Sequence, residues 1–149
     1  VSTIEDFEFC DGVFEALHHF KTLGYLLILV TNQSGIGRGY YREEDFHILT
    51  QWMQNELLHV NSPLDAIYHC PHTPEENCTC RKPKSGMFEH AIQDLNIDVT
   101  QSWMIGDKPS DIEAARGVGI TQTILLGNAQ NSGAKYCVNF LLDTINLIK

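Results

Sequence analysis

The sequence predicts an α/β domain built on a mainly parallel sheet, with helices on both faces. Short apolar runs alternate along the chain with amphipathic stretches of helical spacing. Polar and charged residues follow directly after several of the apolar runs, where the binding residues of open parallel sheets lie. The chain has 149 residues and 43% hydrophobic content, which suffices for one domain, residues 1–149, with a substantial core.

The first half of the chain predicts two helices and two strands. A helix capped by Asp11 is expected to end at Gly24, because apolar residues recur at helical spacing between them. A buried strand follows over Tyr25 to Val30. A second helix opens at the acidic residues after position 42, and a short strand spans Asp65 to His69. The apolar face of the second helix comprises Phe46, Leu49, Met53 and Leu57.

The second half begins with a long irregular stretch from Cys70 to Lys84 and then returns to alternation. The expected elements are a helix from about Ser85 to Leu95, a strand over Trp103 to Ile105, a helix over Pro109 to Gly117, a strand over Thr121 to Leu126, a strand near Tyr136 to Val138 and a helix over Phe140 to Ile148. This order of elements indicates a Rossmann-like sheet.

Composition excludes several classes of partner. The formal net charge of −9 opposes binding to nucleic acid or to anionic membranes, so a zinc-ribbon nucleic-acid binder is disfavoured. The chain has no apolar run long enough to cross a bilayer, and its first residues lack the features of a secretory signal. We therefore expect a cytoplasmic monomer that acts on a small ligand.

Three loops carry residues suited to phosphate chemistry, and each is expected to follow a strand. The loop over residues 31–39 offers hydroxyl, amide and glycine groups to a phosphoryl group, or is an ordinary polar turn. Arg81-Lys82-Pro83 offers cations, or is a solvated basic turn. The segment over residues 106–111 holds two carboxylates and a lysine suited to Mg²⁺, or merely caps a helix.

Taken together and in this order, the three loops resemble motifs two, three and four of the haloacid-dehalogenase-like phosphatases. The resemblance implies that Thr31 and the backbone of Asn32 bind phosphoryl oxygens and that Lys82 stabilises their charge. It also implies that Asp107 ligates Mg²⁺ while Asp111 supports the lysine and the metal. Thr31, Lys82 and Asp107 are the catalytic candidates, since phosphoryl transfer depends mainly on positioning and charge neutralisation.

The first motif of these phosphatases, a strand ending in Asp-x-Asp, does not occur in the 149 residues. In the family its first aspartate attacks phosphorus, and its second protonates the leaving oxygen and then activates water. We therefore expect that the first, nucleophile-bearing strand is missing from the printed chain. The alternative is a catalytically dead, zinc-stabilised interaction module.

Three cysteines and a histidine fall within eleven residues of the irregular stretch, at Cys70, His72, Cys78 and Cys80. Three thiolates and an imidazole are enough for a tetrahedral, structural Zn²⁺, because four protein ligands leave no open position for water. The alternative is a pair of free buried cysteines with an incidental histidine.

This zinc loop followed by Arg-Lys-Pro resembles a capless subgroup of the superfamily, which contains the heptose 1,7-bisphosphate and the histidinol-phosphate phosphatases. The run Thr31 to Tyr40 looks like the heptose branch, so we expect hydrolysis of one phosphate of a heptose 1,7-bisphosphate; the alternative is histidinol phosphate. Expected substrate contacts, besides the phosphoryl ligands, are Gln33, Ser34, Arg81 and Lys108.

Overall fold

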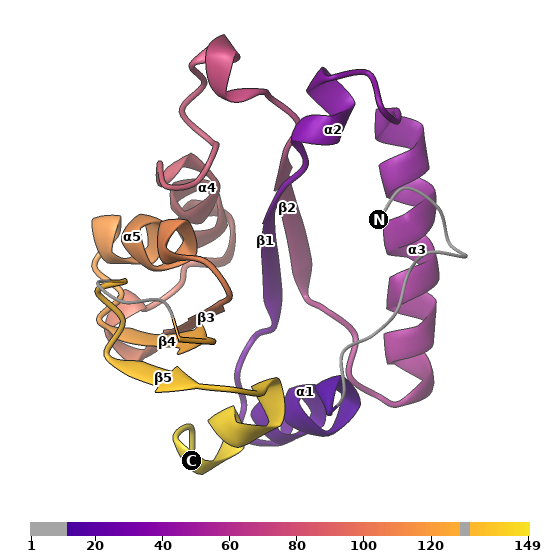
Figure 1. Ribbon diagram of the computed structural model, residues 1–149. Helices are drawn as coiled ribbons and strands as arrows, with labels where there is room; N and C mark the ends of the chain where they lie inside the picture. The colour runs from indigo at the N-terminus through magenta and orange to yellow at the C-terminus, as the bar shows by residue number, and fades with distance from the viewer. Residues whose placement is uncertain (1–11, 129–131) are drawn as a thin grey trace.

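The computed structural model describes residues 12–128 and 132–149. It confirms the predicted α/β architecture of parallel strands and helices (Figure 1). The helices are α1 Val13–Thr22, α2 Ser34–Gly37, α3 Glu43–His59, α4 Gly86–Leu95 and α5 Pro109–Gly117, with 3-10 turns η1 Pro74–Glu76, η2 Val99–Gln101 and η3 Leu141–Asn146. The strands are β1 Ile28–Asn32, β2 Ala66–Cys70, β3 Trp103–Gly106, β4 Gln122–Leu126 and β5 Tyr136–Val138.

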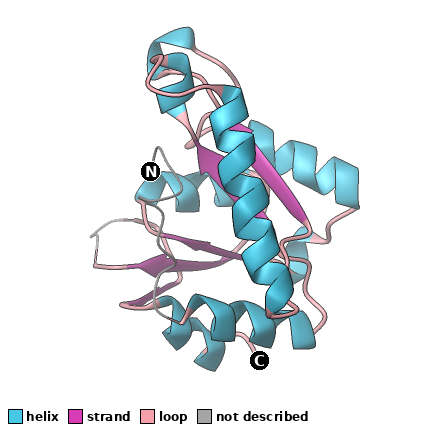
Figure 2. Cartoon of the chain, turned by 90° about the vertical axis from the view of Figure 1, so that its right-hand side faces the viewer, coloured by secondary structure: helices cyan, strands magenta, loops and turns pink. Residues whose placement is uncertain are grey.

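The strands form two parallel groups within the described residues. β1 pairs with β2, with Thr31 opposite His69, while β3, β4 and β5 form a second group in that order. Figure 1 shows α3 on one side of the β1–β2 pair and α4 and α5 on the other. In the turned view of Figure 2, α3 runs across the front of the same strand pair. The carboxyl ends of β1 and β3 are therefore the places where the two groups can share a site.

Two apolar clusters hold the chain together. One joins α1 to the second group of strands and to η3, with Ala16, Phe20, Leu27, Ile124 and Ile148 at its centre. The other packs α4 against α5, with Phe88, Ala114, Ala115 and Ile120 at its centre. Half-buried Val30 of β1 and Met104 of β3 both contact the second cluster, so this cluster anchors both groups of strands.

The strand predicted over Tyr25 to Val30 begins three residues later, at Ile28, and ends at Asn32. The amide of Tyr25 closes the end of α1 on the carbonyl of Phe20, and the amide of Leu27 donates to the Asp65 carboxylate at 2.7 Å. The intervening residues therefore connect helix to strand. As a consequence, Thr31 and Asn32 belong to the strand rather than to the loop after it.

Three other boundaries differ from expectation. The polar loop after β1 contains the short helix α2, and the final helix is the 3-10 turn η3 rather than a longer α-helix. In η3 the hydroxyl of Thr144 donates to the carbonyl of Leu141 at 2.6 Å, and such local bonds compete with α-helical ones. Gly12, in the left-handed region at φ 80°, is the N-cap of α1, and the expected cap Asp11 lies outside the described residues.

Nowhere in the described chain is a helix long and apolar enough to span a membrane.

Candidate active site and zinc centre

A pocket lies at the carboxyl end of β1, between this strand, the segment before α4 and the junction of β3 with α5. Its volume is about 210 Å³. Pockets for drug-sized ligands span roughly 300–1,000 Å³, so this one suits a small group such as a phosphoryl group. It is lined by Thr31, Asn32, Lys82, Asp107, Lys108, Ser110 and Asp111.

Lys82 supplies the buried positive charge of the pocket. Its ammonium donates to the carbonyl of Val30 at 3.0 Å and to a carboxylate oxygen of Asp111. The side chains of Lys82 and Asp111 are only 10% and 5% exposed. A charge held this firmly away from water interacts strongly with an anion brought beside it, because the local dielectric is low.

Asp111 also fixes the backbone at the start of α5. Its Oδ2 accepts hydrogen bonds from the amides of Asp107 and Lys108, both at 3.2 Å. The close approach of this carboxylate requires glycine at position 106, because a Cβ there would overlap the Asp111 side chain. Both oxygens of Asp111 are thus engaged by the protein, one by Lys82 and the other by the backbone.

Asp107 is exposed and lines the pocket, which leaves its carboxylate available to a ligand. An oxygen donor at the pocket rim fits Mg²⁺, which is commonly held by one or two carboxylates together with waters and substrate phosphates. Because Asp111 is engaged elsewhere, Asp107 is the carboxylate that the described residues offer to the metal. Its role as a Mg²⁺ ligand stays a prediction.

Asn32 ties the lysine segment to β1. Its amide nitrogen donates to the carbonyl of Lys82 at 3.3 Å, and its Oδ1 accepts from the Lys82 amide at 3.1 Å. This two-way bond aligns the backbone that carries the lysine with the end of the strand. The side chain of Asn32 therefore positions Lys82, while the resemblance concerned only its backbone.

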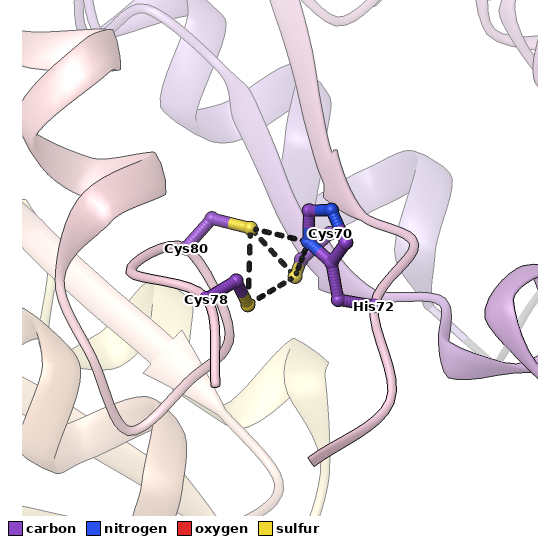
Figure 3. Close-up of side chains that lie close together, drawn as sticks. All are labelled: Cys70, His72, Cys78 and Cys80. Atoms are coloured by element: carbon purple, nitrogen blue, oxygen red, sulfur yellow. Dashed lines mark hydrogen bonds between the residues drawn. The ribbon is translucent and has the colours of Figure 1, made fainter. Parts of the chain in front are cut away.

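The predicted zinc ligands converge from the end of β2 and from the loop before α4 (Figure 3). Cys78 Sγ lies 3.5 Å from Cys70 Sγ and 3.6 Å from Cys80 Sγ, and His72 Nδ1 lies 3.3 Å from Cys80 Sγ. Donors of a tetrahedral zinc with bonds of about 2.0–2.3 Å are spaced by similar distances. Cys80 Sγ and Cys70 Sγ lie closer together, at 2.7 Å, so these two sulfurs would have to separate around a metal. The four ligand atoms, all within 4.8 Å of one another, could hold one metal ion, and three sulfurs with a nitrogen suit a structural Zn²⁺.

The thiols of this centre differ in acidity. Burial disfavours the Cys78 thiolate, but hydrogen bonds from the Arg81 backbone and from the Cys70 and Cys80 side chains outweigh burial and lower the Cys78 pKa to about 6. Burial and the two neighbouring thiols raise the pKa of Cys80 to about 12. Metal binding must therefore displace protons at this centre, with Cys78 the most readily ionised of the three.

The zinc loop also contacts the turn that follows β1. The amide of Gln33 donates to the carbonyl of Cys70 at 2.7 Å, and the amide of Gly37 donates to the carbonyl of Pro71 at 2.9 Å. A side chain at position 37 would overlap the Pro71 carbonyl, so glycine allows this close packing. A metal held by these residues would therefore brace α2 as well as the segment that ends at Lys82.

Three predicted substrate contacts do not line the pocket. Gln33 is bonded to Thr31 and Tyr41 and borders a second, more apolar pocket between β1 and α3. Ser34 opens α2 outside both pockets. Arg81 is half-buried, and its Nη1 is buried without a hydrogen-bond partner among the described residues. Their roles toward substrate remain predictions.

Three other groups at or beside the site were not assigned a role from the sequence. Ser110 lines the pocket, and its place in the Lys108-Pro109-Ser110-Asp111 run was the available signal. The carbonyl of Val30 holds Lys82, and no side-chain pattern could reveal a backbone acceptor. Tyr41, whose hydroxyl donates to Gln33, was also not predicted. This contact depends on how the turn between α2 and α3 folds.

Comparisons with known proteins identify the family of this chain. A family model described as HAD-hydrolase-like matches residues 79–137. A D-glycero-beta-D-manno-heptose-1,7-bisphosphate 7-phosphatase of Haemophilus influenzae is 45% identical over 97% of this chain and 83% of its own length. The protein of the same name in Helicobacter pylori J99 is 51% identical, over 85% of this chain and 73% of its own.

Among solved structures, the D,D-heptose 1,7-bisphosphate phosphatase of B. bronchiseptica, complexed with magnesium and phosphate, superimposes with a TM-score of 0.88. It shares 24% sequence identity, and the match covers 99% of this chain and 87% of that one. This likeness supports the fold. The chain belongs to the haloacid-dehalogenase-like hydrolases and, within them, to the family of the heptose-1,7-bisphosphate 7-phosphatases.

Proposed function

We propose that this protein is a Mg²⁺-dependent phosphatase that removes the 7-phosphate of a heptose 1,7-bisphosphate and leaves the heptose 1-phosphate. The main support for this proposal is the buried Lys82 ammonium, which is held by the Val30 carbonyl and the Asp111 carboxylate. It lines a pocket of phosphoryl size together with Thr31. The names of the relatives at 45% and 51% identity favour the heptose bisphosphate over histidinol phosphate.

The residues of the pocket divide the work of phosphoryl transfer. The Lys82 ammonium neutralises charge on a phosphoryl oxygen. The Thr31 hydroxyl and the backbone N–H of Asn32 donate hydrogen bonds that orient the phosphoryl group. Asp111 holds the Lys82 side chain in place. Asp107 would hold Mg²⁺, which when bound supplies further positive charge for the reacting oxygens.

Turnover by this route needs an aspartate nucleophile, and the 149 residues contain no Asp-x-Asp. Within the described ranges β1 pairs only with β2, and β3 only with β4, so each has an edge free for a further strand. We propose that a strand bearing Asp-x-Asp lies between β1 and β3. Its first carboxylate attacks phosphorus while the second protonates the departing sugar oxygen; the second then deprotonates a water, which hydrolyses the aspartyl-phosphate to inorganic phosphate.

Arg81 is the candidate for the phosphate that does not react. It precedes Lys82 but lies outside the phosphoryl pocket, and its buried Nη1 has no hydrogen-bond partner in the described structure. A buried hydrogen-bond donor without a partner destabilises the protein. A ligand that accepts a hydrogen bond from this nitrogen would therefore be bound more tightly. A sugar bisphosphate carries a second dianion suited to this contact.

The test is phosphate release by the zinc-loaded protein, completed with its Asp-x-Asp strand, in the presence of Mg²⁺. We expect a higher kcat/KM for heptose 1,7-bisphosphate than for histidinol phosphate, with heptose 1-phosphate as the product. Preference for histidinol phosphate would assign the chain to the other branch of the subgroup. No hydrolysis of either ester would favour the inactive, zinc-stabilised interaction module.

We also infer a reducing, cytoplasmic location and a monomeric state. The four described cysteines are free, and three of them are the zinc ligands, as is usual where thiols stay reduced. Cell fractionation and the mass measured by light scattering test these two points.

A further inference from the structure

Three side chains form a hydrogen-bonded chain that ends at the phosphoryl pocket. The Tyr41 hydroxyl donates to Gln33 Oε1, and Gln33 Nε2 donates to Thr31 Oγ1 at 3.0 Å. Thr31 lies near the end of β1, Gln33 is the N-cap of α2, and Tyr41 lies in the turn before α3. Only Thr31 of the three lines the phosphoryl pocket.

The direction of these bonds decides what Thr31 can do. A threonine hydroxyl has one proton to donate, and it can accept on its oxygen. Because Thr31 Oγ1 accepts from Gln33, its own proton remains to be donated elsewhere. Among the described residues, the acceptor that Thr31 reaches is the carbonyl of Asn32, at a long 3.4 Å, so a phosphoryl oxygen in the pocket would be a better partner.

Tyr41 determines which end of the Gln33 amide faces Thr31. A phenol is a better donor than acceptor, since its oxygen lone pairs are delocalised into the ring, so it selects the carbonyl end of the amide. The NH₂ end then faces Thr31. If the amide were reversed, its oxygen would accept the Thr31 proton and the pocket would lose that donor.

Packing keeps the tyrosine in this position. The ring lies directly on Gly35 of α2, where a Cβ would overlap it. Burial raises the pKa of the Tyr41 hydroxyl above its ordinary value, so the group stays protonated and able to donate. The neighbouring Tyr40 is 76% exposed, which makes it a matched control.

We propose that Tyr41 is a positioning residue for phosphate-ester hydrolysis, which acts through Gln33 to keep the Thr31 proton directed at the phosphoryl group. The inference rests on the proposed function. It gives Gln33 a role different from direct contact with substrate. It also gives a reason for the packing of Tyr41 against Gly35 of α2, the helix that follows β1.

The test compares Tyr41→Phe with Tyr40→Phe in the zinc-loaded protein completed with its Asp-x-Asp strand. Loss of one neutral hydrogen bond is expected to raise KM for heptose 1,7-bisphosphate, and the inhibition constant of inorganic phosphate, by about 2- to 10-fold. The Tyr40→Phe variant should match the parent protein. Zinc content and melting temperature, measured on each variant, report whether the fold is kept.

A double-mutant cycle separates positioning from packing. In a Thr31→Val background, Tyr41→Phe should have no further effect on phosphate inhibition, because the hydroxyl it serves is gone. An equal loss in both backgrounds, or no loss in either, would overturn the role of Tyr41 while leaving the phosphatase function intact. If Tyr41→Phe misfolds, Gln33→Met tests the same chain of bonds and should give the same rise. A parent protein that hydrolyses no phosphate ester would refute the proposed function itself.

Discussion

Lys82 and Asp111 form a nearly buried ion pair that links the two groups of strands. Asp111 belongs to α5, directly after β3, while the Lys82 ammonium also bonds the carbonyl of Val30 in β1. The charge that the pocket offers to a phosphoryl group is therefore also a tertiary contact of the fold. Stability and phosphate binding should respond together when the pair is broken.

We expect Lys82→Met to lower the free energy of unfolding by about 3–5 kcal/mol, because it leaves the Asp111 carboxylate buried without its cation. Urea unfolding followed by circular dichroism measures this change. Lys108→Met, at an exposed lysine of the same pocket, should stay within about 0.5 kcal/mol of the parent. Similar stability of the two variants would show that the ion pair contributes little.

The sequence predicted the order of the elements and the composition of the pocket better than it predicted strand ends. Apolar periodicity located α3 and α4, and metal-ligand spacing located the cluster that could hold zinc, because both signals are local. The start of β1 depends on the Asp65 carboxylate, which is distant in sequence. The Tyr41–Gln33 contact likewise depends on how a turn folds, so residue type alone could not reveal it.

One zinc per chain is expected after purification in metal-free buffer, held by the three thiolates and His72. Cys78→Ser should lose most of this metal, since it removes the most easily ionised ligand. Cys137→Ser, at an exposed cysteine outside the cluster, should keep it. Elemental analysis decides the matter, and full zinc content in Cys78→Ser would contradict the assignment.

Removal of zinc should loosen α2 as well as the zinc loop. The amides of Gln33 and Gly37 bond the carbonyls of Cys70 and Pro71, whose positions the metal fixes. Hydrogen exchange at these two amides should accelerate when a chelator removes zinc. The amide of Ile120, which bonds Ala115 in the other half of the chain, is the internal reference and should change little. Unchanged exchange at Gln33 would show that α2 is independent of zinc.

A protein consisting of residues 1–149 alone should show no phosphatase turnover, because its sequence has no Asp-x-Asp. The same protein completed with such a strand should hydrolyse phosphate esters when Mg²⁺ is added. Phosphate release, measured on preparations whose mass is verified, compares the two. Robust Mg²⁺-dependent hydrolysis by the 149-residue chain would mean that another residue acts as nucleophile.

Arg81→Ala should affect the bisphosphate more than a simple monophosphate. Its guanidinium has a buried, unpartnered nitrogen, and it lies beside Lys82 but outside the phosphoryl pocket. If it binds the second phosphate, its loss removes a charged hydrogen bond of about 1.5–3 kcal/mol and lowers kcat/KM for heptose 1,7-bisphosphate by about 10- to 100-fold. Hydrolysis of a simple monophosphate ester should fall much less, because such a substrate has no second phosphate to lose. An equal loss for both substrates would place Arg81 with the reacting phosphate or with the zinc loop, through its backbone bond to Cys78.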